Sequence, residues 1–197
     1  MKTGILGGTF NPPHNGHMHA ARLARKALGL DRVLFIPTNI PPHKALPEDT
    51  ATAADRCEMV RQMIAGEDWA ALDTLEIDRG GDSYTVDTLH ALHQRGEDGL
   101  YLIVGTDMLL SFDRIWRAPD EIARLCTLAV CAREQEDWGA IRKKTEHLRQ
   151  SLRAKIELVQ GGSLTISSTE LRHGGDLRRY TAPAVADYIE RKHLYGF

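Results

Sequence analysis

The sequence predicts an α/β fold, a Rossmann-like open parallel sheet with helices on both faces, in a single domain over residues 1–197. Three observations support this prediction. Residues 4–28 pass from a short apolar run to a glycine turn and then to a helical pattern. About six short apolar runs occur along the chain, separated by stretches of helical period. A chain of 197 residues can bury one substantial core, so one domain is the default expectation.

The composition is that of an ordinary globular protein and narrows the classes of partner. Lys and Arg number 25 and Asp and Glu 27, so the net charge of −2 provides no overall basic field for nucleic acid. No stretch approaches the ~20 apolar residues that cross a membrane, and no signal peptide is recognisable. The three cysteines, Cys57, Cys126 and Cys131, lack CxxC spacing, which favours a reducing cytoplasm over a disulfide scaffold.

The N-terminal segment carries the first candidate site. A buried strand is predicted at residues 5–6, a glycine turn at residues 7–8 and a helix from about residue 15 to 28. In open α/β sheets this arrangement puts a helix N-terminus beside the carboxyl edge of a strand, where phosphorylated ligands bind. His14 and His17 are three apart and share one face if both lie in the opening turn. Their imidazoles could therefore donate hydrogen bonds to phosphate oxygens.

Two other kinds of site compete with phosphate binding here. The glycines do not match the G-x-G-x-x-G of dinucleotide-binding folds, and no G-x-x-x-x-G-K-[ST] loop occurs. His14, His17, His19 and His43 are close enough in sequence for a zinc site, but no carboxylate or Cys at ligand spacing completes it. Gly16 lies between the first two histidines, where it would let a phosphate come close. The phosphate site is therefore favoured.

The following segment contains a stiff loop and two further elements. A strand at residues 33–36 leads into a proline-rich loop over residues 37–44, which ends in Lys44. This loop is either a surface connection or a support that holds the Lys44 cation over an anionic ligand. Residues 50–65 have helical spacing and an apolar face for the core. Apolar and charged residues alternate over residues 72–78, which predicts a strand.

A helix and the clearest strand of the chain come next. The helix follows residues 83–85, and Ser83 or Thr85 is expected to be its N-cap. The strand at residues 101–105 closes with a glycine, which marks a second ligand-facing edge. Asp107 follows this strand, and it either caps the next helix or accepts a hydrogen bond from a ribose hydroxyl.

The remaining core elements complete the predicted sheet. Trp116 is either an ordinary core residue or an aromatic surface on which a flat ring could stack. Strands at residues 127–131 and 156–159 bring the predicted total to about six. The charged helix at residues 138–152 presents a solvated face, and a packing helix is expected over residues 182–194.

A second helix start is predicted near the C-terminus. Residues 167–170 form a Ser-x-x-Glu capping box. Arg172 follows closely, and a cation so near a helix N-terminus opposes the helix dipole unless an anion lies between them. We therefore expect this helix end, which includes Ser167, Ser168 and Thr169, to face a triphosphate.

Two of these segments resemble known signatures. Residues 7–10 together with residues 14–17, His-Asn-Gly-His, resemble the H-x-G-H signature of the nucleotidylyltransferase superfamily. Residues 166–172, Ile-Ser-Ser-Thr-Glu-Leu-Arg, resemble its second signature, I-S-S-T-x-x-R. One position departs from the pattern, because Asn11 stands where the family often has Asp.

Within that superfamily the chain is most similar to the bacterial nicotinate-nucleotide adenylyltransferases. The similarity is carried by Pro-Pro-His-Lys at residues 41–44, Ser-Tyr-Thr-Val-Asp-Thr-Leu at 83–89 and Gly-Thr-Asp at 105–107. The resemblance implies an enzyme that joins ATP to nicotinate mononucleotide, giving nicotinate adenine dinucleotide and pyrophosphate, with a substrate-bound Mg²⁺.

The resemblance also implies roles for individual residues. Catalytic contacts to phosphate are implied for His14, His17, Lys44 and Arg172. Further contacts to ATP are implied for Gly8, Thr9, Phe10, Gly105, Asp107, Ser167, Ser168 and Thr169. Contacts to the mononucleotide are implied for Lys44, Tyr84, Thr85 and Trp116.

Two alternative functions stay open at this point. One is a related transferase that acts on another phosphate, such as phosphopantetheine or glycerol phosphate. The other is a non-catalytic module that binds a nucleotide or a metal. No nucleic acid or membrane partner is expected, a homo-oligomer remains open, and the expected location is the cytoplasm.

Overall fold

The computed structural model describes residues 1–42, 45–132, 137–161 and 166–197. Contacts within the chain separate it into two compact units. The first unit comprises Met1–Leu6, Ala20–Val33 and Tyr84–Ser163, and the second comprises Gly7–His19, Leu34–Ser83 and Leu164–Phe197. The single domain over residues 1–197 stays a prediction.

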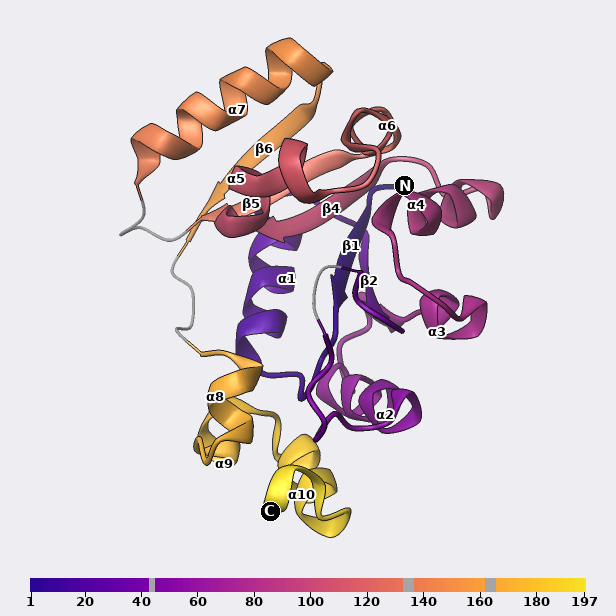
Figure 1. Cartoon of the computed structure of the whole chain (residues 1–197), viewed down its shortest axis with the longest axis vertical. Coiled ribbons are helices and arrows are strands. Elements are labelled where there is room, and N and C mark those ends of the chain that lie inside the picture. Colours follow the sequence, from indigo (N-terminus) through magenta and orange to yellow (C-terminus); the bar gives the residue numbers. More distant parts are fainter. Residues whose placement is uncertain (43–44, 133–136, 162–165) are drawn as a thin grey trace. The chain divides into compact units, whose positions relative to one another are not determined.

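The strands form one six-stranded sheet in the order β3-β2-β1-β4-β5-β6 (Figure 1). Neighbouring strands run parallel in the pairs β1 with β4, β4 with β5 and β5 with β6. The predicted α/β fold with an open parallel sheet is therefore confirmed. The strands are β1 (Thr3–Gly8), β2 (Arg32–Pro37), β3 (Ala70–Leu72), β4 (Leu100–Gly105), β5 (Thr127–Ala132) and β6 (Lys155–Gln160).

The register of the first unit aligns a row of apolar side chains across four strands. Ile5 pairs with Leu102, Leu102 with Leu128, and Leu128 with Ile156. All four residues are buried. This row fixes the register, because a shift by one residue would turn each of these side chains to the other face of the sheet.

Helices cover both faces of the central strands. Leu102, Ile103 and Val104 are consecutive and all buried, and successive side chains of a strand point to opposite faces. Figure 1 shows α7 along one side of β5 and β6 and α1 along the other. The thiol of Cys131 on β5 lies 3.8 Å from the backbone oxygen of Ala20 in α1, which agrees with this arrangement.

Most helices occur where the sequence predicts them. The predicted helices correspond to α1 (Asn15–Leu28), α2 (Ala53–Met63), α4 (Thr85–Gln94), α7 (Trp138–Leu152), α8 (Ser168–Arg172) and α10 (Pro183–Arg191), and α5 (Thr106–Ile115) follows β4 as expected. Four short helices were not predicted: α3 (Leu75–Arg79), α6 (Pro119–Leu125), α9 (Leu177–Tyr180) and the 3₁₀ turn η1 (Leu194–Gly196). None of the helices in the described parts of the chain is long and apolar enough to span a membrane.

The strand predicted over residues 72–78 is wrong. β3 ends at Leu72, and the helix α3 begins at Leu75. The carboxylate of Asp73 accepts a hydrogen bond from the backbone N–H of Leu75 at 3.0 Å, which favours a turn into a helix. Glu76, which the alternating pattern places on the exposed face, is only 6% exposed.

The predicted N-cap of α4 is also wrong. The residue at that position is Tyr84, which makes no capping bond through its side chain. Ser83 instead accepts a hydrogen bond at Oγ from the backbone N–H of Asn39 at 2.9 Å. The hydroxyl of Ser83 thus stabilises the loop after β2.

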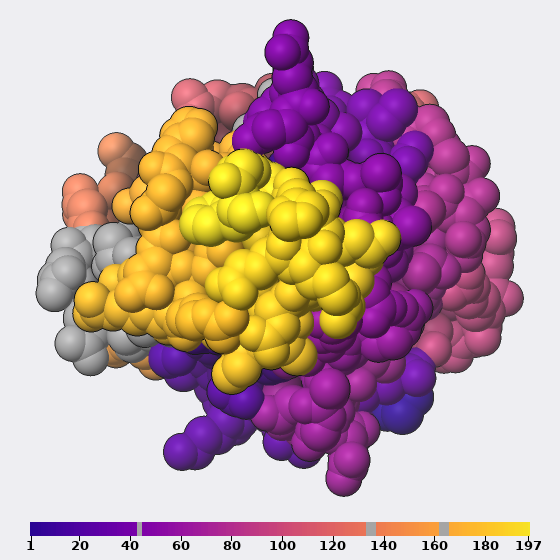
Figure 2. Space-filling view, turned by 90° about the horizontal axis from the view of Figure 1, so that it is seen from below, coloured from indigo at the N-terminus to yellow at the C-terminus, as the bar shows by residue number. Residues whose placement is uncertain are grey.

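The second unit is held together by its C-terminal helices. Figure 2 shows the C-terminal segment, in yellow, lying against the purple region that includes α2. The Tyr188 hydroxyl of α10 donates to Oδ1 of Asp55 in α2 at 2.7 Å. This packing places the C-terminus beside the segment that carries the candidate site.

Candidate active site

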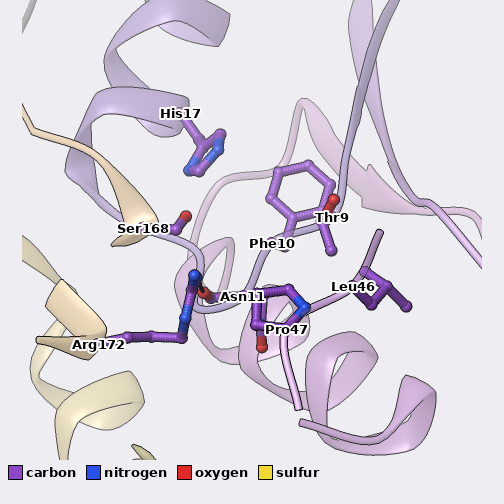
Figure 3. Close-up of a pocket in the computed structure, with 8 residues that line it drawn as sticks. All are labelled: Thr9, Phe10, Asn11, His17, Leu46, Pro47, Ser168 and Arg172. Carbon is purple, nitrogen blue, oxygen red and sulfur yellow. Dashed lines mark hydrogen bonds between the residues drawn. The ribbon is translucent and has the colours of Figure 1, made fainter. Parts of the chain in front are cut away.

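A pocket in the second unit brings together three stretches that are distant in sequence (Figure 3). The stretch after β1 contributes residues up to the start of α1, the loop after β2 contributes two residues, and α8 contributes two more. The lining residues are Thr9, Phe10, Asn11, His17, Leu46, Pro47, Ser168 and Arg172.

The segment after β1 turns sharply at Phe10. Its φ of 50° lies in the left-handed region, which a bulky residue rarely adopts. The buried ring of Phe10 packs against Phe35 and His17, with centroid distances of 6.2 and 4.9 Å, and this packing offsets the cost of the unfavourable backbone conformation. A Cβ at Gly8 would lie 3.3 Å from the Phe10 ring, so a glycine there leaves room for this packing.

The backbone of this segment is held by a buried cation that the sequence analysis missed. Nη1 of Arg56, on α2, donates to the carbonyl oxygen of Thr9 at 2.8 Å and to that of Thr38 at 2.6 Å. Arg56 is buried. The loops after β1 and β2 are therefore joined by one guanidinium group.

The two histidines lie together, as predicted. Their ring centroids are 3.8 Å apart. The backbone N–H of His14 donates to Nδ1 of His17 at 3.1 Å. Because Nδ1 accepts this bond, a neutral His17 carries its proton on Nε2. His17 thus has one fixed acceptor and one available donor, and it lines the pocket.

His14 has a different environment from the one predicted. It is 8% exposed and does not line the pocket, and its Nδ1 is buried without a hydrogen-bond partner in the described part of the chain. A Cβ at Gly16 would lie only 2.9 Å from this Nδ1. Gly16 therefore makes room for the imidazole of His14, and the expectation that it lets a phosphate come close stays a prediction.

Burial keeps both imidazoles neutral. It lowers the pKa of His14 to about 4, although the charge of Glu170 acts in the opposite direction. Burial also lowers the pKa of His17 well below its ordinary value, and the neighbouring His14 lowers it further. At neutral pH the pair consequently offers hydrogen-bond donors and no charge, unless a bound anion raises these pKa values.

Arg172 supplies the cation of the pocket. It is 8% exposed, and its Nη1 donates to the carbonyl oxygen of Asn11 at 2.6 Å. Its Nε lies 3.5 Å from Oδ2 of Asp49. The predicted conflict with the helix dipole is wrong, because α8 has only five residues and Arg172 is its last. A cation at the C-terminal end of a helix is favourable.

The start of α8 lies beside the segment that leads from β1 to the start of α1. The hydroxyl of Ser168 donates to the carbonyl oxygen of Pro12 at 2.8 Å. The predicted capping box is present: Oγ of Ser167 accepts from the backbone of Glu170, whose carboxylate accepts from the backbone of Ser167. Ser168 and Arg172 reach the pocket, whereas Ser167 and Thr169 do not line it.

Three pocket residues were not predicted, and one predicted residue cannot be placed. Leu46 and Pro47 continue the proline-rich loop after β2, whose stiffness was the available signal. Asn11 was noted only as a departure from a family pattern. Lys44 lies outside the residues that the structure describes.

The remaining candidates belong to the first unit. Gly105 ends β4 and is the N-cap of α5, so the capping role considered for Asp107 is wrong, and Asp107 is exposed. Trp116 is half-buried, and its ring centroid lies 5.3 Å from that of Phe112. Thr85 is the first residue of α4.

Tyr84 has a cationic neighbour that the sequence analysis missed. The guanidinium of Arg117 lies 4.5 Å from the centroid of its ring. The same group lies 4.0 Å from Oδ2 of Asp87. Arg117 is exposed, so it remains accessible to an anion near Tyr84.

Comparison with known proteins identifies the family. The family model described as cytidylyltransferase-like matches residues 5–174. A protein of Synechococcus sp. (strain JA-3-3Ab) named "probable nicotinate-nucleotide adenylyltransferase" is 40% identical over 199 residues, covering 98% of this chain and 94% of the relative. A protein of the same name from Dehalococcoides mccartyi is 38% identical, and the match covers 99% of this chain and 97% of that relative. The chain belongs to the nicotinate-nucleotide adenylyltransferase family.

The fold of this family member agrees with a distant solved structure. The Plasmodium falciparum nicotinic acid mononucleotide adenylyltransferase complexed with NaAD is similar with a TM-score of 0.78 at 20% identity. The match covers 100% of this chain and 98% of that one. At this level of identity the comparison shows a shared fold.

The pocket has polar groups suited to an anion. Across residues 1–42, 45–132, 137–161 and 166–197, no three His, Cys, Asp or Glu side chains are grouped so as to hold a metal ion. The lining side chains that carry hydrogen-bond donors are those of Thr9, Asn11, His17, Ser168 and Arg172.

Proposed function

We propose that the protein transfers AMP from ATP to nicotinate mononucleotide, with nicotinate adenine dinucleotide and pyrophosphate as products. The family supports the reaction. The observation in this chain that carries the proposal is that His17 and Arg172, from two separate signatures, line one pocket. A polyphosphate matches this pair, because it offers acceptors for the imidazole and negative charge for the guanidinium.

The reaction needs alignment more than covalent chemistry. A phosphate oxygen of the mononucleotide attacks the α-phosphorus of ATP, and a new P–O bond forms. The bond between the α-phosphorus and the bridging oxygen breaks, and its electron pair leaves with pyrophosphate. An enzyme accelerates such a step by holding the reactants in line and by stabilising charge on the phosphate oxygens.

The residues of the pocket have distinct proposed roles. Nε2–H of His17 donates to an α-phosphate oxygen, and His14 orients His17 through the backbone bond to Nδ1. Arg172 binds the β- and γ-phosphates together with the start of α8. Lys44 is proposed for the same phosphates from the sequence alone. The backbone at residues 8–10 lines the nucleotide.

The candidates of the first unit keep the roles inferred from the sequence. We propose that Gly105 and Asp107 contact ATP, with the Asp107 carboxylate accepting from a ribose hydroxyl. Tyr84, Thr85 and Trp116 are proposed to contact the nicotinate half. The neighbouring Arg117 adds a cation that would favour the acid over the amide of the pyridine ring.

Mg²⁺ is proposed to enter with its polyphosphate. Mg²⁺ keeps several waters and is commonly bound through substrate phosphates, which suits a pocket whose donors are cationic or neutral. When bound, the ion neutralises charge on the phosphate oxygens. The protein's own contribution is to hold those phosphates through Arg172 and the start of α8.

The remaining expectations stay predictions. The three cysteines are free thiols, as expected in the predicted cytoplasmic location. A single nucleotidylyltransferase domain over residues 1–197 is also proposed.

An acceptor panel tests the proposed function. Pyrophosphate release is measured with ATP and either nicotinate mononucleotide, nicotinamide mononucleotide, phosphopantetheine or glycerol 3-phosphate, and with CTP in place of ATP. We expect release with ATP and nicotinate mononucleotide at the highest kcat/KM. Preference for phosphopantetheine, or for CTP with glycerol phosphate, would instead identify a related transferase. Absence of release with every pair would favour a binding module.

A further inference from the structure

The C-terminal turn η1 reaches a segment that lines the pocket. The hydroxyl of Tyr195 donates to Oδ1 of Asn11 at 2.7 Å. Asn11 lines the pocket, whereas Tyr195 does not. We infer that Tyr195 is a positioning residue for the adenylyl transfer and that it acts through Asn11 on Arg172. This inference rests on the proposed function.

The side chain of Asn11 is the centre of this arrangement. Asn11 is 2% exposed, and its Oδ1 accepts a second hydrogen bond from the backbone N–H of Ala51 at 3.1 Å. Its Nδ2 donates to Oγ1 of Thr50 at 3.3 Å, and Thr50 donates onward to the carbonyl oxygen of Pro47 at 2.6 Å. The Asn11 amide therefore accepts through Oδ1 and donates through Nδ2. A carboxylate at this position could accept in the same way but could donate only if it were protonated.

The backbone of the same residue holds the pocket cation. The carbonyl oxygen of Asn11 accepts from Nη1 of Arg172 at 2.6 Å. A movement of Asn11 would therefore shift the guanidinium that we assign to the β- and γ-phosphates. The neighbouring carbonyl of Thr9 is held separately by Arg56, so the Asn11 end of this segment depends on Tyr195, Ala51 and Thr50.

Tyr195 is well suited to hold this position. Its φ of 59° and the φ of 52° at His193 turn the chain back after α10. Both values lie in the left-handed region that residues other than glycine rarely adopt, so the turn is sustained by the contacts that it makes. Burial raises the pKa of the Tyr195 phenol, which keeps its hydroxyl a donor.

The test compares two tyrosines of the same C-terminal region. Tyr195→Phe removes the hydroxyl that donates to Asn11, and the control Tyr188→Phe removes one that donates to Asp55 at the same distance of 2.7 Å. Both variants lose one part-buried hydrogen bond, but only the first bond reaches a pocket residue. The wild-type protein is assayed first with ATP and nicotinate mononucleotide, so that failure of the proposed function is seen independently.

We expect Tyr195→Phe to lower kcat/KM for ATP by about threefold to tenfold, the scale of one hydrogen bond, while KM for nicotinate mononucleotide is unchanged. Tyr188→Phe should lower the melting temperature to a similar extent and leave both kinetic constants within about twofold. Equal kinetics for the two variants, or a parallel loss for both substrates, would overturn the inference even if the wild type is active.

A double-mutant cycle tests whether Tyr195 acts through Asn11. In an Asn11→Ala background, the further change Tyr195→Phe should leave kcat/KM for ATP unaltered, because the acceptor is already absent. Additive losses would show that Tyr195 acts by another route. The ATP dissociation constant from calorimetry, measured on the same four proteins, provides a readout that does not require turnover.

Discussion

The rings of His14 and His17 lie against each other, tilted by 32°, and the backbone N–H of His14 donates to Nδ1 of His17 at 3.1 Å. This bond selects the tautomer of His17 before any ligand arrives. Only the donor at Nε2 then remains for a phosphate oxygen. At neutral pH the pair therefore provides a preorganised hydrogen-bond donor and carries no positive charge.

The first prediction concerns this donor. His17→Ala should lower kcat by about a hundredfold or more, the scale of removing one group that stabilises the transition state. Folding should be affected little, since His17 is only partly buried. Steady-state pyrophosphate release and a thermal melt measure the two effects. The control is His173→Ala, at an exposed position after α8, and a His17→Ala enzyme within a fewfold of wild type would contradict the assignment.

The second prediction concerns pH and the buried His14. Burial lowers the pKa of His14 to about 4 in the folded protein, whereas in the unfolded chain it is near 6.5. Between these values the unfolded chain binds a proton that the folded protein does not, so stability is full above about pH 6.5 and falls as the pH is lowered toward 4. The effect is on the order of 1.4 kcal/mol per pKa unit.

Urea unfolding at several pH values from 7 to 4.5 measures this dependence. Carboxyl groups titrate in the same range, so the informative quantity is the difference between wild type and His14→Gln. We expect the variant to lose less stability than the wild type over this range. Parallel curves for the two proteins would show that His14 is not responsible.

The sequence predicted the elements that depend on local pattern. The helix at residues 138–152 was placed correctly because its apolar period is a local signal. The region 72–78 was placed wrongly because alternation of apolar and charged residues also fits one turn of helix. The turn was decided by the hydrogen bond from Leu75 to Asp73 and by the burial of Glu76.

The sequence motifs predicted which residues line the candidate site, but not which residues hold them in place. His17, Ser168 and Arg172 share a pocket as expected. Arg56 and Tyr195 were not foreseen, because their role depends on backbone and amide atoms brought near by tertiary packing. The reasoning for Arg172 was wrong since it assumed a longer helix than the five residues of α8.

The third prediction follows from the observed position of Arg172. Arg172→Ala should raise KM for ATP and also destabilise the ligand-free protein by about 1–3 kcal/mol, because a buried charged hydrogen bond to the Asn11 carbonyl is lost. Arg178→Ala is the matched control, since Arg178 forms exposed ion pairs with Asp187 and Glu190, whose loss should change the stability little. Denaturant unfolding without ATP measures both. Equal stability of Arg172→Ala and wild type would remove the structural role and leave only the phosphate role.

The fourth prediction uses Gly16 to separate sterics from helix propensity. Gly16 lies in the first turn of α1 with ordinary helical geometry, so an alanine there would by itself favour the helix by up to about 1 kcal/mol. Its Cβ, however, would lie 2.9 Å from Nδ1 of His14. The imidazole of His14 must then move, and because its ring centroid lies only 3.8 Å from that of His17, the His17 ring is displaced as well.

Gly16→Ala should therefore lower kcat by at least about tenfold, the scale of a misaligned catalytic donor, although alanine is the better helix former. Gly139→Ala is the matched control, because Gly139 is likewise the second residue of its helix and a Cβ there would approach only Oδ1 of Asp137, at 3.1 Å. Asp137 lies in the other unit and is exposed, so kcat should not change. If Gly16→Ala kept full activity, the spacing of the histidine pair could not be what aligns the phosphoryl group.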